Sequence, residues 1–207
     1  MSNIVAGLDI GTSNIRLVVG EAAKRDSLPR WRALVRRPAQ GLRRGYIVNF
    51  EETLRALREA VRETEKLAKI KIKSVFLAVG GISLESRFVE GQTMVARADL
   101  QVTADDIERC LEASKNLANL QNRHLLHAIP VVYKIDGQKI FGQPVGLTGR
   151  KLEVKTLIVY CSSQHLNDFV KVVEQAGLAV EDIIASPLAG SLPVLTSTQK
   201  MAGCVLV

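Results

Sequence analysis

The sequence contains few cysteine and aromatic residues. The small number of cysteines argues against a disulfide-stabilised protein and against a cysteine-based metal site. Only 3 of its 207 residues are cysteine, and Cys110, Cys161 and Cys204 lie far apart in the chain. An odd number of widely spaced thiols is typical neither of a disulfide framework nor of a Cys-x-x-Cys metal site. We therefore expect three reduced thiols in buried positions.

Long uncharged segments are also missing. The longest, 183–199, is interrupted by Pro187 and Pro193, and no basic stretch followed by an apolar one stands at the start. These features predict a cytosolic chain without a signal peptide or a membrane-spanning helix. The chain is 47% hydrophobic and 24% charged, so 207 residues are enough to bury a core in one or two domains.

The net charge of +7 comes from one segment. Between Lys24 and Arg44 there are eight basic residues and a single acid, Asp26. A solvated loop or a contact with an acidic partner is one interpretation, and nucleic-acid binding is the other. The segment has few aromatics beyond Trp31 and no recognisable nucleic-acid module. We therefore favour the first interpretation and expect no nucleic-acid partner.

Near the start, an apolar run leads into a short polar motif. Asp9, Gly11, Thr12, Ser13 and Asn14 separate it from a second apolar run. The pattern is typical of a β-hairpin that binds phosphate, because Gly11 lets the backbone approach an anion and the turn can aim successive amides at it. Asp9 would then hold a hydrated Mg²⁺ ion. An ordinary β-hairpin with a polar tip remains the alternative.

The spacing of apolar residues predicts an α/β chain with an inserted α+β module. Thr103, followed by Asp106 three residues later, is expected to start the helix of the module. Gly177 is expected to end a later helix. The predicted strands are the hairpin around 4–20, 32–35, 46–48, 73–80, 84–89, 92–96, 123–135, 152–161, 180–185 and 203–207, and the helices follow residues 51, 103, 163 and 187. The strand at 73–80 is expected to be buried on both faces because its apolar run is continuous.

Six blocks of sequence, in order, resemble the bacterial cell-division FtsA family, which is actin-like. They are residues 7–15, 37–49, 72–81, 124–130, 144–154 and 173–178. The resemblance implies an actin/Hsp70-like mixed sheet of ribonuclease-H type with helices, incomplete in this sequence. Residues 1–82 and 162–207 would form part of subdomain 1A. Residues 83–161 would be the inserted strand-helix-strand-strand subdomain 1C, the SHS2 module.

The resemblance also implies a function and partners. FtsA-like proteins bind ATP with Mg²⁺, which here would involve Gly11, Thr12, Ser13, Asn14 and Asp9. They polymerise, with subdomain 1C in the filament contact, on the cytoplasmic face of the cell membrane at the division site. There they tether FtsZ and recruit later division proteins. A C-terminal helix touches the membrane in the family.

Two departures from the family limit the expected activity. FtsA relatives continue past a strand like 203–207 into a second phosphate loop and a second lobe, so the resemblance implies that this sequence corresponds to an N-terminal fragment. We therefore expect weak or no ATP binding by this stretch alone. Ser186 stands where hydrolytic actin-fold relatives place Gln or Glu, and a hydroxyl is a poorer base than a carboxylate. We expect a slow ATPase at most, with no catalytic residue here and no turnover by the fragment.

Two other interpretations of the family relationship remain. An actin-fold phosphotransferase of the sugar-kinase type would share the Asp9 motif, but it needs a catalytic Asp near the sugar. Asp99, Asp105, Asp106 and Asp136 all fall in the expected insert. The pilus-assembly ATP-binding homologue, which shares the inserted module, is the other possibility.

A histidine pair offers a weaker metal-site candidate. His124 and His127 are three residues apart, which on a helix would be ligand spacing. They fall on a predicted strand, where that spacing places them on opposite faces. Core or surface histidines are therefore favoured over a metal site.

Overall fold

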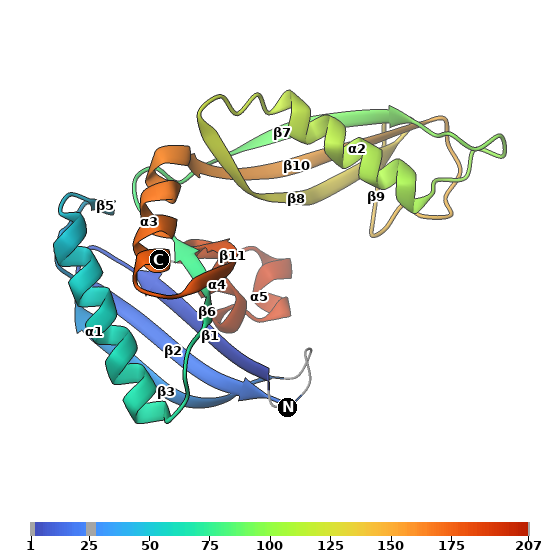
Figure 1. Ribbon diagram of the computed structural model, residues 1–207. Coiled ribbons are helices and arrows are strands. Elements are labelled where there is room, and N and C mark those ends of the chain that lie inside the picture. The colour runs from blue at the N-terminus through green and yellow to red at the C-terminus, as the bar shows by residue number, and fades with distance from the viewer. Residues whose placement is uncertain (1–2, 24–27, 207) are drawn as a thin grey trace. The chain divides into compact units, whose positions relative to one another are not determined.

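Residues 3–23 and 28–206 are described by the computed structural model, and they form two units, one inserted in the other (Figure 1). The first unit falls within residues 1–84 and 162–207, and the second comprises Glu85–Cys161. The boundaries expected from the sequence lie between residues 82 and 83 and between residues 161 and 162. Each unit has a sheet of its own, so each is described separately.

The first unit is built on a mixed sheet of five strands. They are β1 (Asn3–Ile10), β2 (Asn14–Ala22), β3 (Arg30–Pro38), β6 (Ser74–Val79) and β11 (Ala179–Ala185), in the order β11-β6-β1-β2-β3. Antiparallel pairs join β1 to β2 and β2 to β3, whereas β6 is parallel to both β1 and β11. The carboxyl ends of β1, β6 and β11 therefore meet at one edge. The expected mixed sheet with helices is confirmed.

Helices pack on this sheet along their apolar faces. The helix α1 (Phe50–Ala68) contacts β2 and β3 and buries Leu54 and Leu57. It begins at Asn49, whose side chain accepts a hydrogen bond from the amide of Glu52 at 3.2 Å. The remaining elements of the unit are β4 (Leu42–Arg43), β5 (Tyr46–Ile47), α3 (Ser163–Gln175), α4 (Ser186–Val194) and α5 (Ser197–Ala202). In the fold, α3 contacts α1, β5 and β11.

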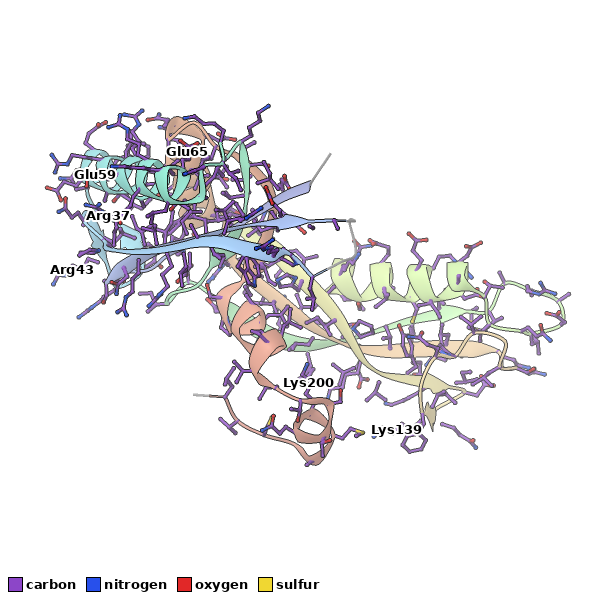
Figure 2. The ribbon with its side chains drawn as sticks, turned by 90° about the horizontal axis from the view of Figure 1, so that it is seen from below. Arg37, Arg43, Glu59, Glu65, Lys139 and Lys200 are labelled. Carbon is purple, nitrogen blue, oxygen red and sulfur yellow. The ribbon has the colours of Figure 1, made fainter. Side chains whose placement is uncertain are left out.

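The basic segment 24–44 is partly neutralised inside the first unit. Arg37 on β3 donates hydrogen bonds to Glu63 at 2.7 Å and to Glu59 at 2.9 Å, both on α1. Figure 2 shows Arg37 reaching toward Glu59 from the neighbouring strand. Residues 24–27 lie outside the described part of the chain. Part of the basic segment, which was expected to face solvent or an acidic partner, is therefore paired with acidic residues of α1 in the same chain.

The strand β6 is buried on one face only, so the prediction of burial on both faces is wrong. Val75, Leu77 and Val79 are at most 1% exposed, whereas Phe76 on the opposite face is 41% exposed. A continuous apolar run does not reveal which face of a strand a neighbouring layer covers. In the described residues, the face that carries Phe76 is incompletely covered.

The second unit is a four-stranded sheet with one helix. Its elements are β7 (Glu85–Met94), α2 (Ala104–Leu117), β8 (Arg123–Ile135), β9 (Gln138–Ile140) and β10 (Lys151–Ser162), and the sheet order is β7-β10-β8-β9. The helix lies along the sheet in Figure 1. The predicted capping box of Thr103 and Asp106 is confirmed. The expected strand-helix-strand-strand order is present, with the short β9 added.

A glycine explains why one long strand was expected as two. Gly91 lies inside β7, where the sequence predicted a break between 84–89 and 92–96. A Cβ atom at Gly91 would collide with the carbonyl of Cys110 and would lie 2.6 Å from the amide of Ser114, both on α2. Gly91 therefore allows the helix to approach the strand closely, and the strand continues through it.

The end of the described chain differs from the prediction. Residues 203–206 form no strand, and the predicted strand at 203–207 is wrong within the described part. No neighbouring strand pairs with this segment there, and Val205 is 88% exposed. Cys204 is exposed, whereas Cys110 and Cys161 are buried as expected. A β-strand needs a partner for its amides and carbonyls, which an apolar sequence alone does not supply.

Candidate phosphate-binding site

The hairpin between β1 and β2 forms a tight turn. The amide of Gly11 donates to the carbonyl of Asn14 at 3.0 Å, so this amide serves the turn itself and is not free for an anion. A Cβ atom at Gly11 would lie 3.3 Å from the same carbonyl, which explains why glycine suits the position. Thr12 and Ser13 at the tip are exposed, and no partner is recorded for their amides among the described residues.

A cavity of 470 Å³ lies beside this turn. Its lining comes from 9–12 at the end of β1, 44–45 between β4 and β5, 80–82 after β6, and Ser186 at the start of α4. The carboxyl ends of β1, β6 and β11 thus converge on one hollow, the usual position of a ligand site in an α/β sheet. Of the expected site residues, Asp9, Gly11 and Thr12 line the cavity, while Ser13 and Asn14 do not.

Two glycines shape the wall of the cavity. Gly45 and Gly81 both have positive φ angles, +83° and +94°, which side chains disfavour. Their backbones touch, because a Cβ at Gly45 would lie 3.0 Å from the α-carbon of Gly81. The turn between β4 and β5 can therefore approach the loop after β6 only with glycine at these positions.

Thr12 is tied to this wall by its side chain. The amide of Gly45 donates to Oγ1 of Thr12 at 2.8 Å. Since the hydroxyl oxygen accepts this bond, its own proton is available for an oxygen acceptor in the cavity. Thr12 therefore combines an oriented hydroxyl with an exposed backbone amide, two donors of the kind that bind phosphate.

The charged groups at the cavity have opposite signs. Among the described residues that line the cavity, Asp9 is the only acid and Arg44 is the only base. Asp9 is not free, since Nη1 of Arg16 on β2 donates to its Oδ2 at 2.7 Å. Both side chains are partly exposed, so solvent weakens the pair. The described residues contain no group of three metal-ligating side chains.

The hydroxyl of Ser186 indicates whether the cavity suits a polar ligand. Its hydroxyl is buried and lacks a hydrogen-bond partner among the described residues. The contact with Gly80, where a Cβ would lie 3.1 Å from Ser186 Oγ, brings this hydroxyl to the cavity wall. A buried hydroxyl without a partner is costly, and water or a phosphate oxygen in the cavity would satisfy it. The residues present thus fit a hydrated anion.

Sequence reasoning missed part of this site. Arg44, Gly45 and the 80–82 loop line the cavity, but the sequence assigned them no role. A Gly-Gly pair directly after a strand marks a loop or turn, and this signal was present at Gly80-Gly81. His124 and His127 do lie on one strand, β8, as expected.

The matched family model describes the SHS2 domain inserted in FtsA, and it covers residues 81–160. Relatives align over nearly the whole chain. Cell division protein FtsA of Pseudomonas aeruginosa is 34% identical over 99% of this chain and 48% of its own length. The corresponding protein of Escherichia coli K12 is 30% identical over the same shares. This chain thus spans about half the length of the curated relatives it matches.

A solved structure supports the fold independently. A chain of the PilM-PilN type IV pilus biogenesis complex matches with a TM-score of 0.60, covering 92% of this chain and 49% of its own length. At 20% identity this likeness concerns the fold alone. No helix in the described residues is both long enough and apolar enough to cross a membrane. In sequence, this chain is similar over nearly its whole length to cell division protein FtsA, and its residues 81–160 match the SHS2 domain that is inserted in FtsA.

Proposed function

We propose that this chain is the nucleotide-binding part of a cell-division scaffold of FtsA type. The observation that carries the proposal is the convergence of Asp9, Thr12 and the unpartnered hydroxyl of Ser186 on one cavity, at the carboxyl ends of three strands. The name that the relatives share, cell division protein FtsA, supports the biological context.

The proposed ligand is the phosphate chain of ATP with Mg²⁺. The amides and hydroxyls of Thr12 and Ser13 would bind phosphate oxygens, and Gly11 and Asn14 would hold the turn that presents them. Asp9 would orient water on Mg²⁺ once Arg16 releases it. Bound Mg²⁺ would neutralise part of the phosphate charge. Ser186 has a hydroxyl where a strong base would speed hydrolysis, so turnover is slow at most.

The proposed partners follow the FtsA relationship. Residues 83–161, the SHS2 domain, would take part in self-association, and the complete protein would bind FtsZ and recruit later division proteins at the cytoplasmic face of the membrane. The phosphotransferase alternative lacks support at the cavity, because Asp9 is the only acid among the described lining residues and a sugar kinase needs a second carboxylate as base. The likeness to the pilus complex extends only to the fold.

Hydrogen exchange measured by mass spectrometry on the full-length protein tests the ligand. ATP with Mg²⁺, and also pyrophosphate with Mg²⁺, should slow exchange in peptides that cover residues 9–14, whereas adenosine alone should not. The variant Thr12→Val should lose this protection, and Thr93→Val on β7 is the matched control. Equal protection by adenosine would contradict a phosphate site at the hairpin.

Co-sedimentation tests the scaffold role. The full-length protein should pellet with FtsZ polymers, and it should self-associate in the presence of ATP. Replacing residues 85–161 by a short linker should reduce self-association. ATP-dependent phosphorylation of a hexose, without binding to FtsZ, would favour the kinase alternative instead.

A further inference from the structure

A buried histidine lies at the centre of a hydrogen-bond chain that begins at the β1–β2 hairpin, residues 9–14, which we call the phosphate hairpin. His165 is 2% exposed and stands in the first turn of α3. Its Nε2 atom lies 2.7 Å from the carbonyl oxygen of Gly45. A carbonyl can only accept, so Nε2 carries the proton and donates it. The amide of the same Gly45 residue donates to Thr12 Oγ1 at 2.8 Å.

The second ring nitrogen contacts a buried serine. In the neutral ring, Nδ1 carries a lone pair and accepts a hydrogen bond from the hydroxyl of Ser83, which is 4% exposed. The ring is also held by aromatic neighbours. Its centroid is 4.6 Å from that of Tyr46 and 4.8 Å from that of Phe169, the latter edge-on. Both nitrogens are thus satisfied, and packing fixes the orientation of the ring.

Ser83 and His165 lie next to the two chain connections that join the two units. Ser83 comes directly before Leu84, where the chain leaves the first unit, and His165 closely follows Ser162, where it returns. The amide of His165 also faces the Ser162 hydroxyl, the N-cap of α3, at 3.5 Å. One side chain therefore connects the phosphate hairpin, through Gly45, to both connections that lead into the SHS2 domain.

We propose that His165 is a positioning residue that couples Thr12, at the phosphate hairpin, to both connections of the inserted domain. The coupling rests on the proposed nucleotide function for its biological use, but the hydrogen-bond path exists without a ligand. A change in the position of Thr12 shifts Gly45, and Gly45 shifts the ring that holds Ser83 and the start of α3. Such coupling is reciprocal, so the state of the connections also changes the hairpin.

A ligand-free experiment tests the path. Thr12→Val removes the acceptor for the Gly45 amide while keeping the shape of the side chain. In the full-length protein, it should raise hydrogen exchange about fivefold at the Leu84 amide, which donates to Gly81, and in the first turn of α3. Unchanged exchange at both connections, in a variant that melts as a folded protein, overturns the proposal.

Two substitutions of the ring separate its two links. His165→Gln places an amide near Nε2 and keeps the donor to Gly45, but it loses the acceptor for Ser83. In this background, Thr12→Val should still raise hydrogen exchange at the start of α3 but no longer at the Leu84 amide. His165→Asn loses the Gly45 link, so Thr12→Val should act on neither connection. If Thr12→Val changes hydrogen exchange in the same way in His165→Gln and in His165→Asn, the proposal is overturned.

A milder variant and a control complete the design. Ser83→Ala leaves the ring in place and should remove the effect of Thr12→Val at Leu84 alone, which keeps the test valid if a His165 variant is unstable. His124→Asn, at an exposed position on β8, should change nothing. With ATP and Mg²⁺ added, protection should appear at both connections and disappear in His165→Asn. Absence of protection at Thr12 itself contradicts nucleotide binding, while the ligand-free arm still decides the role of His165.

Discussion

Arg16 donates a hydrogen bond from Nη1 to Oδ2 of Asp9 at 2.7 Å, so the one acid found among the described residues of the cavity lining is paired with a cation across the hairpin. The side chains are 48% and 35% exposed, and solvent weakens the pair. Arg16 therefore competes with any ion that Asp9 would orient.

Removing the competitor should strengthen Mg²⁺-dependent binding. In Arg16→Ala, the affinity for ATP with Mg²⁺ should rise by about threefold, because the exposed pair contributes less than about 1 kcal/mol. Titration calorimetry on the full-length protein measures the effect, and without Mg²⁺ it should be absent. Arg32→Ala breaks the exposed pair with Glu21 on the same sheet and should leave affinity unchanged. Equal changes in both variants would contradict a role for Asp9.

The close approach of Gly45 to Gly81 predicts a stability effect with an internal control. Gly45→Ala should lower the free energy of unfolding by about 2–3 kcal/mol, because both the positive φ and the contact with Gly81 oppose a methyl group. Gly177→Ala has a similar φ of +91° but open space, and should cost about 1 kcal/mol. Urea denaturation measures both. Equal costs would mean that the contact is unimportant.

Asp106 should make the second unit sensitive to acid. Its side chain is 1% exposed, and burial opposes ionisation. Hydrogen bonds from the amide and hydroxyl of Thr103, from Arg109 and from the amide of Ala96 outweigh burial and lower the pKa of Asp106 to about 2. Because this folded pKa lies below the unfolded value, the ionised group stabilises the fold above pH 4, and the contribution is lost as pH falls toward 2.

The variant Asp106→Asn measures this contribution. At pH 7 it should lower the free energy of unfolding by about 2 kcal/mol, and the difference from the parent should shrink between pH 4 and pH 2. Urea titrations across this range provide the comparison. Asp105→Asn changes an exposed acid of the same helical turn and should cost less than about 0.5 kcal/mol. A difference that persists unchanged at pH 2 would contradict the assignment.

The three thiols should react at different rates. Burial raises the pKa of Cys110 to about 11 and also raises that of Cys161, whereas Cys204 is exposed. At pH 8 a disulfide reagent should therefore modify Cys204 alone in the folded protein. The other two thiols should react only in denaturant. Cys204→Ser should abolish the native reaction, and rapid labelling of Cys110 in the folded chain would contradict its burial.

Local signals in the sequence predicted much of the fold. The helix α1 follows from apolar residues at helical spacing, and the start of α2 follows from the Thr103–Asp106 capping box, because both depend on neighbours within a few residues. The end of α3 follows from Gly177, whose φ is +91°. Helix starts and ends of this kind are determined by residues only a few positions apart in the sequence.

Long-range contacts were harder to anticipate. The 41% exposure of Phe76 depends on which layer covers the sheet, and the strand expected at 203–207 lacks a partner in the described residues. The approach of Gly45 to Gly81 and the ring of His165 join segments far apart in the chain. Hydrophobic pattern predicts elements, but only tertiary packing decides which residues far apart in sequence come together.

The first and last strands of the inserted unit are hydrogen-bonded neighbours. Glu85 on β7 pairs with Tyr160 on β10, and the antiparallel register continues to Met94 and Lys151. The two ends of the unit therefore leave its sheet side by side. A segment with adjacent ends can be gained, lost or exchanged by a single recombination event with little disturbance of the host gene product. This arrangement lets the inserted domain join a host protein at one point of its chain with little disturbance of the host fold.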